Sequence, residues 1–300
     1  MIHWKNRFLP RRVRWTLRNM AARCGLVCGT SSTSTQMNAE EVVHNARQYL
    51  HDWCGILGAD LDVFSGKHVL EVGPGNNLAT ALLILSCGAS KVTCVDILPK
   101  LDTARGRATY GLLRGQLDNV GARLDPLFDG DELLVSMDSD SALAYLGDCP
   151  IEEAWHRLGP NRFDLVVSRA VLEHTYSLEK SIDSTWRLLK PDGRMAHKVD
   201  LRSHDEGEEV HPLEFLTYSE RCWRWMTSHT GEPNRQRKGV YVQLLRKYGF
   251  IIEAFQITHS LPREVVASLR PQLAMPFRDM PEEELTDTGI LFAAHKPPAT

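Results

Sequence analysis

Several features that assign a chain to a structural class are missing from this sequence. No run of its 300 residues approaches the ~18 to 20 consecutive apolar residues that cross a bilayer, which argues against an integral membrane protein. None of its seven cysteines belongs to a C-x-x-C pair, so neither a zinc ribbon nor a dithiol redox motif is expected. We therefore expect buried thiols and a cytoplasmic protein.

Acidic residues are absent from the first 39 positions. That segment carries seven basic residues, whereas the rest of the chain has 28 basic and 38 acidic residues. The leader is therefore basic and the body acidic. Because an acidic body lacks the basic surface that phosphates require, we do not expect a nucleic-acid partner.

The basic leader has the pattern of an amphipathic helix. At 100° per residue, one stripe holds arginines and the opposite stripe holds apolar residues; the two sets are Arg7, Arg11, Arg14 and Arg18, and Leu9, Val13, Leu17, Met20 and Cys24. Positions 25–35 are rich in Gly, Ser and Thr and are typical of a flexible linker. We therefore divide the chain into a leader and linker at 1–36 and one folded domain at 37–300.

Two interpretations of the leader remain open. Residues 1–24 could bind an anionic membrane surface, with Trp4, Phe8 and Trp15 as interfacial anchors, which would make the protein peripheral on the membrane. Alternatively, the helix packs on its own domain.

Beyond the leader, the apolar pattern alternates between short strands and helices. This order predicts an α/β fold, a Rossmann-like three-layer sandwich with a mainly parallel seven-stranded sheet whose last strand is antiparallel. The expected strands cover 68–72, 91–95, 142–146, 163–168, 194–199, 250–258 and 289–295. The expected helices between them include 78–86, 100–117, 178–189 and 240–248.

A glycine-containing turn follows the first predicted strand. Gly73 and Gly75 carry no Cβ, so the main chain there can approach a ligand closely. The next strand ends in Asp96, which is placed to accept hydrogen bonds from two ribose hydroxyls. Because ligands bind at the carboxyl ends of strands in such sheets, the turn and the acid together predict a nucleoside-containing cofactor.

Two cofactors fit this turn. A nicotinamide dinucleotide favours G-x-G-x-x-G, but position 78 is Leu. S-adenosylmethionine has no phosphate and needs an acid near the first strand to balance its positive charge, which Glu71 would supply. The residues therefore favour S-adenosyl-L-methionine as the cofactor.

With these motifs the chain resembles the class I S-adenosylmethionine-dependent methyltransferases from about residue 67 to residue 199. The resemblance implies cofactor-binding residues at the ends of the first four strands. They are Glu71, Gly73, Gly75 and Asn77 at the first strand, Asp96 and Ile97 at the second, Asp148 and Cys149 at the third, and Ser168 at the fourth. Asn77 stands where many members carry a third glycine. The segments 163–174 and 188–194 resemble the family's fourth strand and the turn before its fifth.

The residues that would face the methyl acceptor, here called the acceptor side of the site, are expected after the fourth and fifth strands. Glu173 and His174 follow one of them, Asp200 and His204 follow the other, and loops after neighbouring parallel strands converge. A neutral histidine suits removal of a hydroxyl proton, so His174 is the first candidate for the catalytic base and His204 the second, each oriented by Asp200 or Glu173. The same groups could bind a divalent cation. Since Ala170 occupies the position of a further Glu in related metal-binding families, no metal is expected.

The sequence thus predicts an enzyme that methylates a small-molecule or sugar-like acceptor, most simply on oxygen. The run 197–204 resembles one in methyltransferases of sugar and surface-polysaccharide gene clusters. Three alternatives remain: a noncatalytic cofactor-binding module of a membrane assembly, an NAD(P)-dependent oxidoreductase and, disfavoured by the acidic body, a nucleic-acid methyltransferase.

Overall fold

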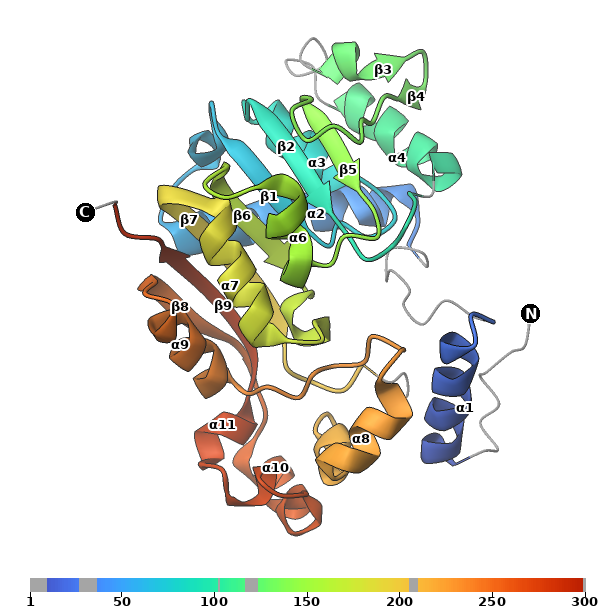
Figure 1. Cartoon of the computed structure of the whole chain (residues 1–300), viewed down its shortest axis with the longest axis vertical. Helices are drawn as coiled ribbons and strands as arrows, with labels where there is room; N and C mark the ends of the chain where they lie inside the picture. The colour runs from blue at the N-terminus through green and yellow to red at the C-terminus, as the bar shows by residue number, and fades with distance from the viewer. Residues whose placement is uncertain (1–9, 27–36, 102, 117–123, 205–209, 299–300) are drawn as a thin grey trace.

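The central element is a seven-stranded sheet with the strand order β5-β2-β1-β6-β7-β9-β8 (Figure 1). The computed structural model describes residues 10–26, 37–101, 103–116, 124–204 and 210–298. The sheet consists of β1 (His68–Val72), β2 (Lys91–Val95), β5 (Leu143–Leu146), β6 (Phe163–Arg169), β7 (Leu189–Asp200), β8 (Ile251–Ser260) and β9 (Asp287–His295). Neighbours from β5 to β7 are parallel, and β9 is antiparallel to both β7 and β8. The predicted fold class is confirmed.

All seven predicted strands are present, and the largest difference in their bounds is at β7. This strand begins at Leu189, whereas the sequence predicts a turn up to Gly193 and a strand from Arg194. The expected turn is held in the sheet by main-chain hydrogen bonds, because Asp192 N–H donates to Lys296 O at 3.0 Å and Lys296 N–H donates to Gly193 O at 2.9 Å. A local sequence pattern cannot predict this pairing, because Lys296 lies near the other end of the chain.

Helices cover both faces of the sheet and make the outer two layers. One apolar core lies under α2 (Ala39–Leu57), α3 (Ala79–Ser86) and α4 (Thr103–Gln116). The other lies under α6 (Ile151–Leu158), α7 (Leu178–Leu188) and α9 (Lys238–Lys247). Neighbouring residues of β1, Val69 and Leu70, belong to opposite cores, as the alternation of side chains along a strand requires. A small hairpin, β3 (Phe128–Asp129) and β4 (Glu132–Leu133), lies beside the sheet.

A third apolar cluster, here called the cap, lies beyond the carboxyl ends of the strands. It combines residues 213–226 with residues 266–285 and with Trp15 near the start of the chain. Its helices are α8 (Glu220–Thr227), α10 (Arg263–Leu269) and α11 (Glu282–Thr286). The sequence does not predict this pairing, because the cluster joins segments that lie far apart in the chain.

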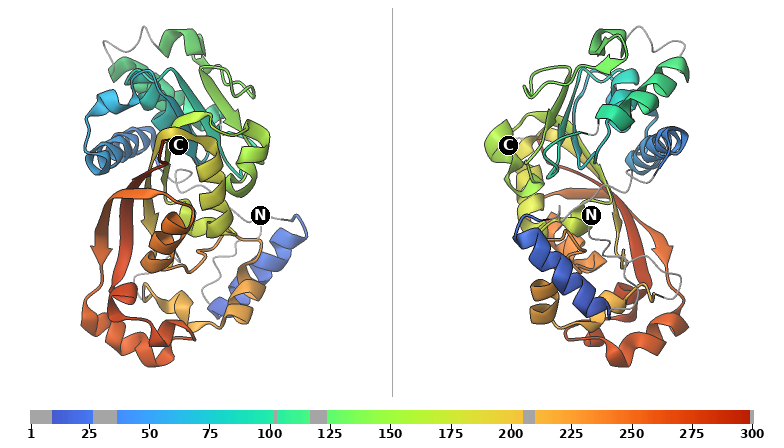
Figure 2. Two further views of the ribbon diagram at one scale, coloured as in Figure 1. Left: turned by 60° about the vertical axis from the view of Figure 1, so that its left-hand side comes forward. Right: turned by 90° about the vertical axis from the view of Figure 1, so that its right-hand side faces the viewer.

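The predicted leader helix is present as α1 (Arg11–Arg23) and lies alongside α8 in both views of Figure 2. Its Trp15 packs edge-on against Trp223 with ring centroids 5.2 Å apart. The helix therefore packs on its own domain, as one of the two interpretations expects. The expected anchors Trp4 and Phe8, and most of the expected linker, at 27–35, lie outside the described residues. No helix in the described ranges is long and apolar enough to cross a membrane.

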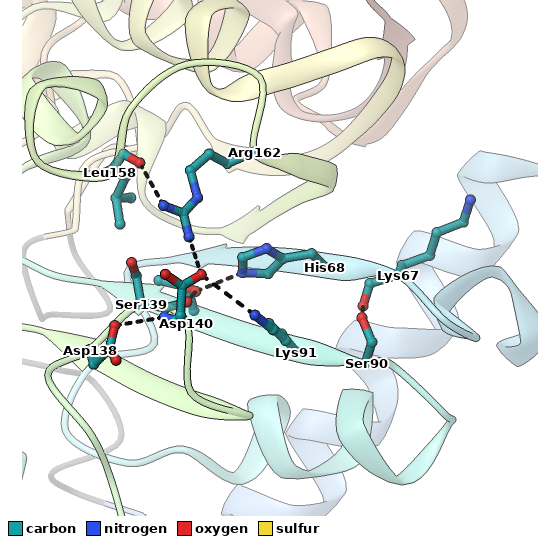
Figure 3. A network of polar contacts seen from close by, with 10 residues as sticks. Lys67, His68, Ser90, Lys91, Asp138, Ser139, Asp140, Leu158 and Arg162 are labelled. Carbon is teal, nitrogen blue, oxygen red and sulfur yellow. Dashed lines mark hydrogen bonds and ion pairs between the residues drawn. The ribbon is translucent and has the colours of Figure 1, made fainter.

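Polar contacts fix the amino-terminal edge of the sheet (Figure 3). There Asp140 accepts from Arg162 at 2.6 Å and pairs with Lys91 at 3.5 Å. His68 is half-buried in this network, and burial lowers the pKa of its ring to about 4. Because these groups bind one another, we assign them a structural role.

Candidate functional site

A cavity opens at the carboxyl edge of the sheet, between the ends of β1, β2 and β6. Its lining brings together five of the residues that the sequence assigns to the site, namely Gly73, Asp96, Ile97, Cys149 and His174. It also contains Tyr176, which follows the Glu173-His174 pair by two residues and was not predicted. One cavity thus joins the expected cofactor side to the expected acceptor side.

The turn after β1 requires glycine for two reasons. Gly73 has a φ of +70°, and a Cβ on it would lie 2.4 Å from Cγ2 of Val171. Gly75 has a φ of +77° and donates its N–H to Asp96 Oδ2 at 2.9 Å. Asn77, in the position of the family's third glycine, accepts from Ala79 N–H at 3.1 Å and so binds the first turn of α3. The glycines therefore shape the cavity, and Asn77 stabilises the helix that follows.

Asp96 is the best-placed group for a ribose. It is 8% exposed, and burial raises the pKa of its carboxyl, while main-chain N–H groups of Leu98 and Gly75 act in the opposite direction. Its Oδ1 accepts from Leu98 N–H at 2.8 Å and its Oδ2 from Gly75 N–H at 2.9 Å. Because each carboxylate oxygen can accept a second hydrogen bond, the carboxyl fits two ribose hydroxyls.

The loop after β5 forms the wall next to Asp96. Cys149 donates its N–H to Asp96 O at 2.8 Å. A Cβ on Gly147 would lie 2.4 Å from Pro99 O, so glycine allows the two loops to touch. Asp148, predicted to meet the adenine, is exposed with a φ of 49° and does not line the cavity. The loop fits a nucleoside base through Cys149 and its main chain, and the role of Asp148 stays a prediction.

Glu71 lies deeper than the sequence suggests. Its side chain is buried, accepts from the Cys94 thiol at 3.7 Å and does not belong to the lining of the cavity. Burial raises the pKa of its carboxyl to about 8. At neutral pH this group is therefore mainly protonated, and it can balance a positive cofactor only if it loses that proton on binding.

We expect the substitution Glu71→Gln to reduce the dependence of stability on pH. Folding keeps this carboxyl protonated up to about pH 8, whereas the unfolded chain ionises it near 4.5. Its contribution to stability is complete below the unfolded pKa and is lost as the pH rises through the folded pKa. The free energy of unfolding in urea, measured from about pH 5 to about pH 9, should thus fall less steeply in the variant.

The exposed Glu132→Gln variant, on the β3–β4 hairpin, serves as the control for this experiment and should keep the wild-type slope. Equal slopes for Glu71→Gln and wild type would mean that Glu71 is ionised in the folded protein.

On the acceptor side, Glu173 and His174 lie in a short 3-10 helix, Leu172–His174. Glu173 is buried and its Oε1 accepts from Asp200 N–H at 3.1 Å, while no donor among the described residues reaches its Oε2. Burial raises the pKa of Glu173 to about 8. Burial and the neighbouring His204 lower the pKa of His174 to about 4. Both side chains are thus mainly uncharged at neutral pH.

The orientation of His174 is fixed by the loop that follows α8. Its Nδ1 lies 2.6 Å from Gly231 O. A carbonyl oxygen can only accept, so Nδ1 carries the proton and Nε2 carries the lone pair. The sequence gives no signal for this contact, because the partner is a main-chain atom 57 residues away.

His204 completes the acceptor side. Its ring centroid lies 4.7 Å from that of His174, and its Nε2 lies 3.8 Å from Asp200 Oδ2. Burial would raise the pKa of Asp200, but hydrogen bonds from Arg202 and the nearby His204 hold it below its ordinary value. The structure thus brings together all four predicted acceptor-side residues.

Ser168, predicted to touch the cofactor, is buried near the end of β6. Its hydroxyl is 2.7 Å from Nδ1 of His197, and both side chains are buried. Trp53 donates its indole N–H to Ser168 O at 3.3 Å. Ser168 does not belong to the lining of the cavity, so its contact with the cofactor stays a prediction.

A cation could be held by one cluster of described residues. Ligand atoms of Glu173, His174 and His204 all lie within 4.8 Å of one another. Neutral imidazoles and a carboxylate suit a divalent transition metal. Glu173 would first have to lose its proton.

A family model described as a methyltransferase domain matches residues 43–254. No curated protein matches the sequence. One similar structure is an S-adenosylmethionine-dependent methyltransferase from Mesorhizobium loti, with 16% identity, coverage of 78% of this chain and 92% of that one, and a TM-score of 0.44. Another is 1,6-didemethyltoxoflavin-N1-methyltransferase from Burkholderia thailandensis, with 18% identity, coverage of 96% and 91%, and a TM-score of 0.44. The domain match carries the assignment.

Proposed function

Because the match to the methyltransferase domain spans residues 43–254, this chain belongs to that family of S-adenosylmethionine-dependent methyltransferases, and we propose that it methylates a hydroxyl of a small-molecule or sugar-like acceptor. The observation that carries the proposal is the single cavity lined by both Asp96 and His174. This supports the proposal, because the group that would bind the ribose and the group that would act as the base line the same cavity.

On the cofactor side, S-adenosylmethionine would supply a methyl group activated by its sulfonium. We infer that Asp96 accepts the two ribose hydroxyls and that Gly73 and Gly75 let the main chain lie against the cofactor. Ile97 and Cys149 would enclose the adenine. The unused acceptor capacity of the Asp96 carboxyl supports this arrangement.

We expect Asp96→Ala to weaken binding of S-adenosylmethionine and of its demethylated product by about 10- to 150-fold. A hydrogen bond to a charged group is worth about 1.5 to 3 kcal/mol, which corresponds to that range. Calorimetric titration measures the effect, and thermal unfolding checks that the variant is folded.

Asp129→Ala, at an exposed position of β3, is the matched control and should bind like the wild type. Wild-type affinity in Asp96→Ala would remove the ribose assignment. Tight binding of a nicotinamide dinucleotide would favour the oxidoreductase instead.

On the acceptor side, we infer that Nε2 of His174 takes the hydroxyl proton as the methyl group is transferred. The tautomer set by Gly231 O leaves the lone pair of Nε2 available, and the low pKa keeps the ring neutral. His204 and Asp200 would then stabilise the charge that forms on His174. Glu173 would orient the start of the loop after β7, because its Oε1 accepts from Asp200 N–H.

The acceptor is identified by incubating candidate hydroxyl compounds and saccharides with isotope-labelled S-adenosylmethionine. Mass spectrometry should detect a labelled methyl ether on oxygen. Label on nitrogen or carbon would contradict O-methylation. Cofactor binding without transfer to any acceptor of either class would favour the noncatalytic module.

We also infer that residues 1–24 attach the protein peripherally to an anionic membrane. The absence of acidic residues from the first 39 positions supports this.

A further inference from the structure

The leader helix α1 packs on the domain with the opposite side from the one its sequence suggests. The arginine stripe faces the protein, since Arg14 and Arg18 are half-buried and Arg18 pairs with Glu232 at 3.1 Å. Trp15 and Asn19 are buried on the same side. The side of α1 that would normally enter a core is therefore turned outward.

The outward side is an apolar stripe, here defined as Val13, Leu17 and Met20. These residues are 41%, 38% and 57% exposed. Their spacing of four and three puts them in one line along the helix. Arg12 and Arg23 are both exposed and lie about 90° round the helix from the stripe.

We propose that this apolar stripe docks α1, parallel to the surface, on an anionic lipid bilayer. An interfacial helix buries an apolar stripe at the boundary between headgroups and acyl chains, while basic side chains beside it meet anionic headgroups. Charge complementarity favours this occupant, because the exposed Arg12 and Arg23 lie beside the stripe and the first 39 residues hold no acidic residue. The inference deepens the membrane part of the proposed function and rests on it.

Hydrogen bonds connect the docking helix to the acceptor side of the site. Asn19 donates to Trp225 O at 2.8 Å and accepts from His229 N–H at 2.7 Å. Two residues further on, Gly231 O binds Nδ1 of His174 at 2.6 Å. The segment 225–232 thus touches α1 and His174 at once, so docking of α1 would hold the acceptor side of the cavity near the lipid surface.

The test compares two methionine substitutions in the full chain. Met20→Glu puts a charge in the apolar stripe, and Met137→Glu makes the same change at a methionine that is 82% exposed elsewhere. Co-sedimentation uses vesicles of phosphatidylcholine with phosphatidylglycerol, and vesicles of phosphatidylcholine alone. We expect the wild type to bind only the anionic vesicles and to be released by salt. Met20→Glu should weaken binding by at least about tenfold, and Met137→Glu should not.

Three results would overturn the proposal: no binding of the wild type, equal binding by Met20→Glu, or equal binding to both kinds of vesicle. A wild-type dimer that Met20→Glu converts to a monomer without any vesicle binding would assign the stripe to a second copy of the chain. Calorimetric titration with S-adenosylmethionine is measured on the same samples. If the wild type binds S-adenosylmethionine, only the docking inference fails. If the wild type does not bind S-adenosylmethionine, the proposed function itself is removed.

Discussion

We expect His174→Ala to lower turnover by about 10²- to 10⁴-fold with nearly unchanged affinity for S-adenosylmethionine, since a positioned general base contributes about that much to a rate. His174 lines the cavity together with Asp96, and Gly231 O fixes its proton on Nδ1. Loss of the ring would remove the proposed base and leave Asp96, the proposed ribose ligand, in place. Steady-state kinetics with the identified acceptor and calorimetric titration of the cofactor measure the two quantities.

His204→Ala should lower turnover less than His174→Ala, because in the proposed mechanism His204 acts only through the neighbouring His174. His51→Ala, at an exposed position of α2, is the control for removal of an imidazole and should be fully active. Activity of His174→Ala within a few-fold of wild type would contradict the assignment. If His204 and Asp200 variants were inactive and a chelator silenced the parent enzyme, the cation cluster would explain the site instead.

The acid side of the rate profile gives a second readout for His174. An ordinary histidine gains a proton near pH 6.5, but burial and His204 lower the pKa of His174 to about 4. The ring therefore stays neutral and basic as the pH falls through 6.5. The rate should hold over that range, and a steep loss centred near 6.5 would point to a more exposed histidine.

The strands and the cofactor turn could be predicted because their causes are local. A buried strand such as β1 needs a run of apolar residues, and the turn after it needs glycine at Gly73, where a Cβ would meet Val171. Asp96 could be placed because it ends the next strand. In each case the residue type is dictated by neighbours a few positions away or by the sheet itself.

The parts that could not be predicted depend on contacts between distant segments. His174 gets its tautomer from Gly231, and any residue could supply that carbonyl. The hydrogen bond of the Ser168 hydroxyl could not be predicted either, because its partner His197 lies on the next strand. The charge of Glu71 depends on how deeply it is buried. The helical pattern of α1 was visible, but the side that packs on the domain was not, because the buried Trp15 stands on the arginine side of the helix.

The largest expected effect on stability comes from Trp15→Ala, and it decides whether α1 is part of the folded domain or a separate leader. Trp15 is 7% exposed and packs edge-on against both Tyr218 and Trp223, with ring centroids 5.7 and 5.2 Å away. Removing a buried tryptophan side chain costs about 3 to 5 kcal/mol, because it removes apolar contact and leaves a cavity.

If α1 unfolds together with the cap, the free energy of unfolding in urea should fall by that amount in Trp15→Ala. Trp225→Ala is the matched control, since this tryptophan of α8 is 64% exposed and should change stability by less than about 0.5 kcal/mol. A different result would support the division at residue 36: unchanged global stability in Trp15→Ala, together with faster trypsin cleavage after Arg23. The helix would then detach on its own, and Asn19 could not hold the 225–232 segment against His174.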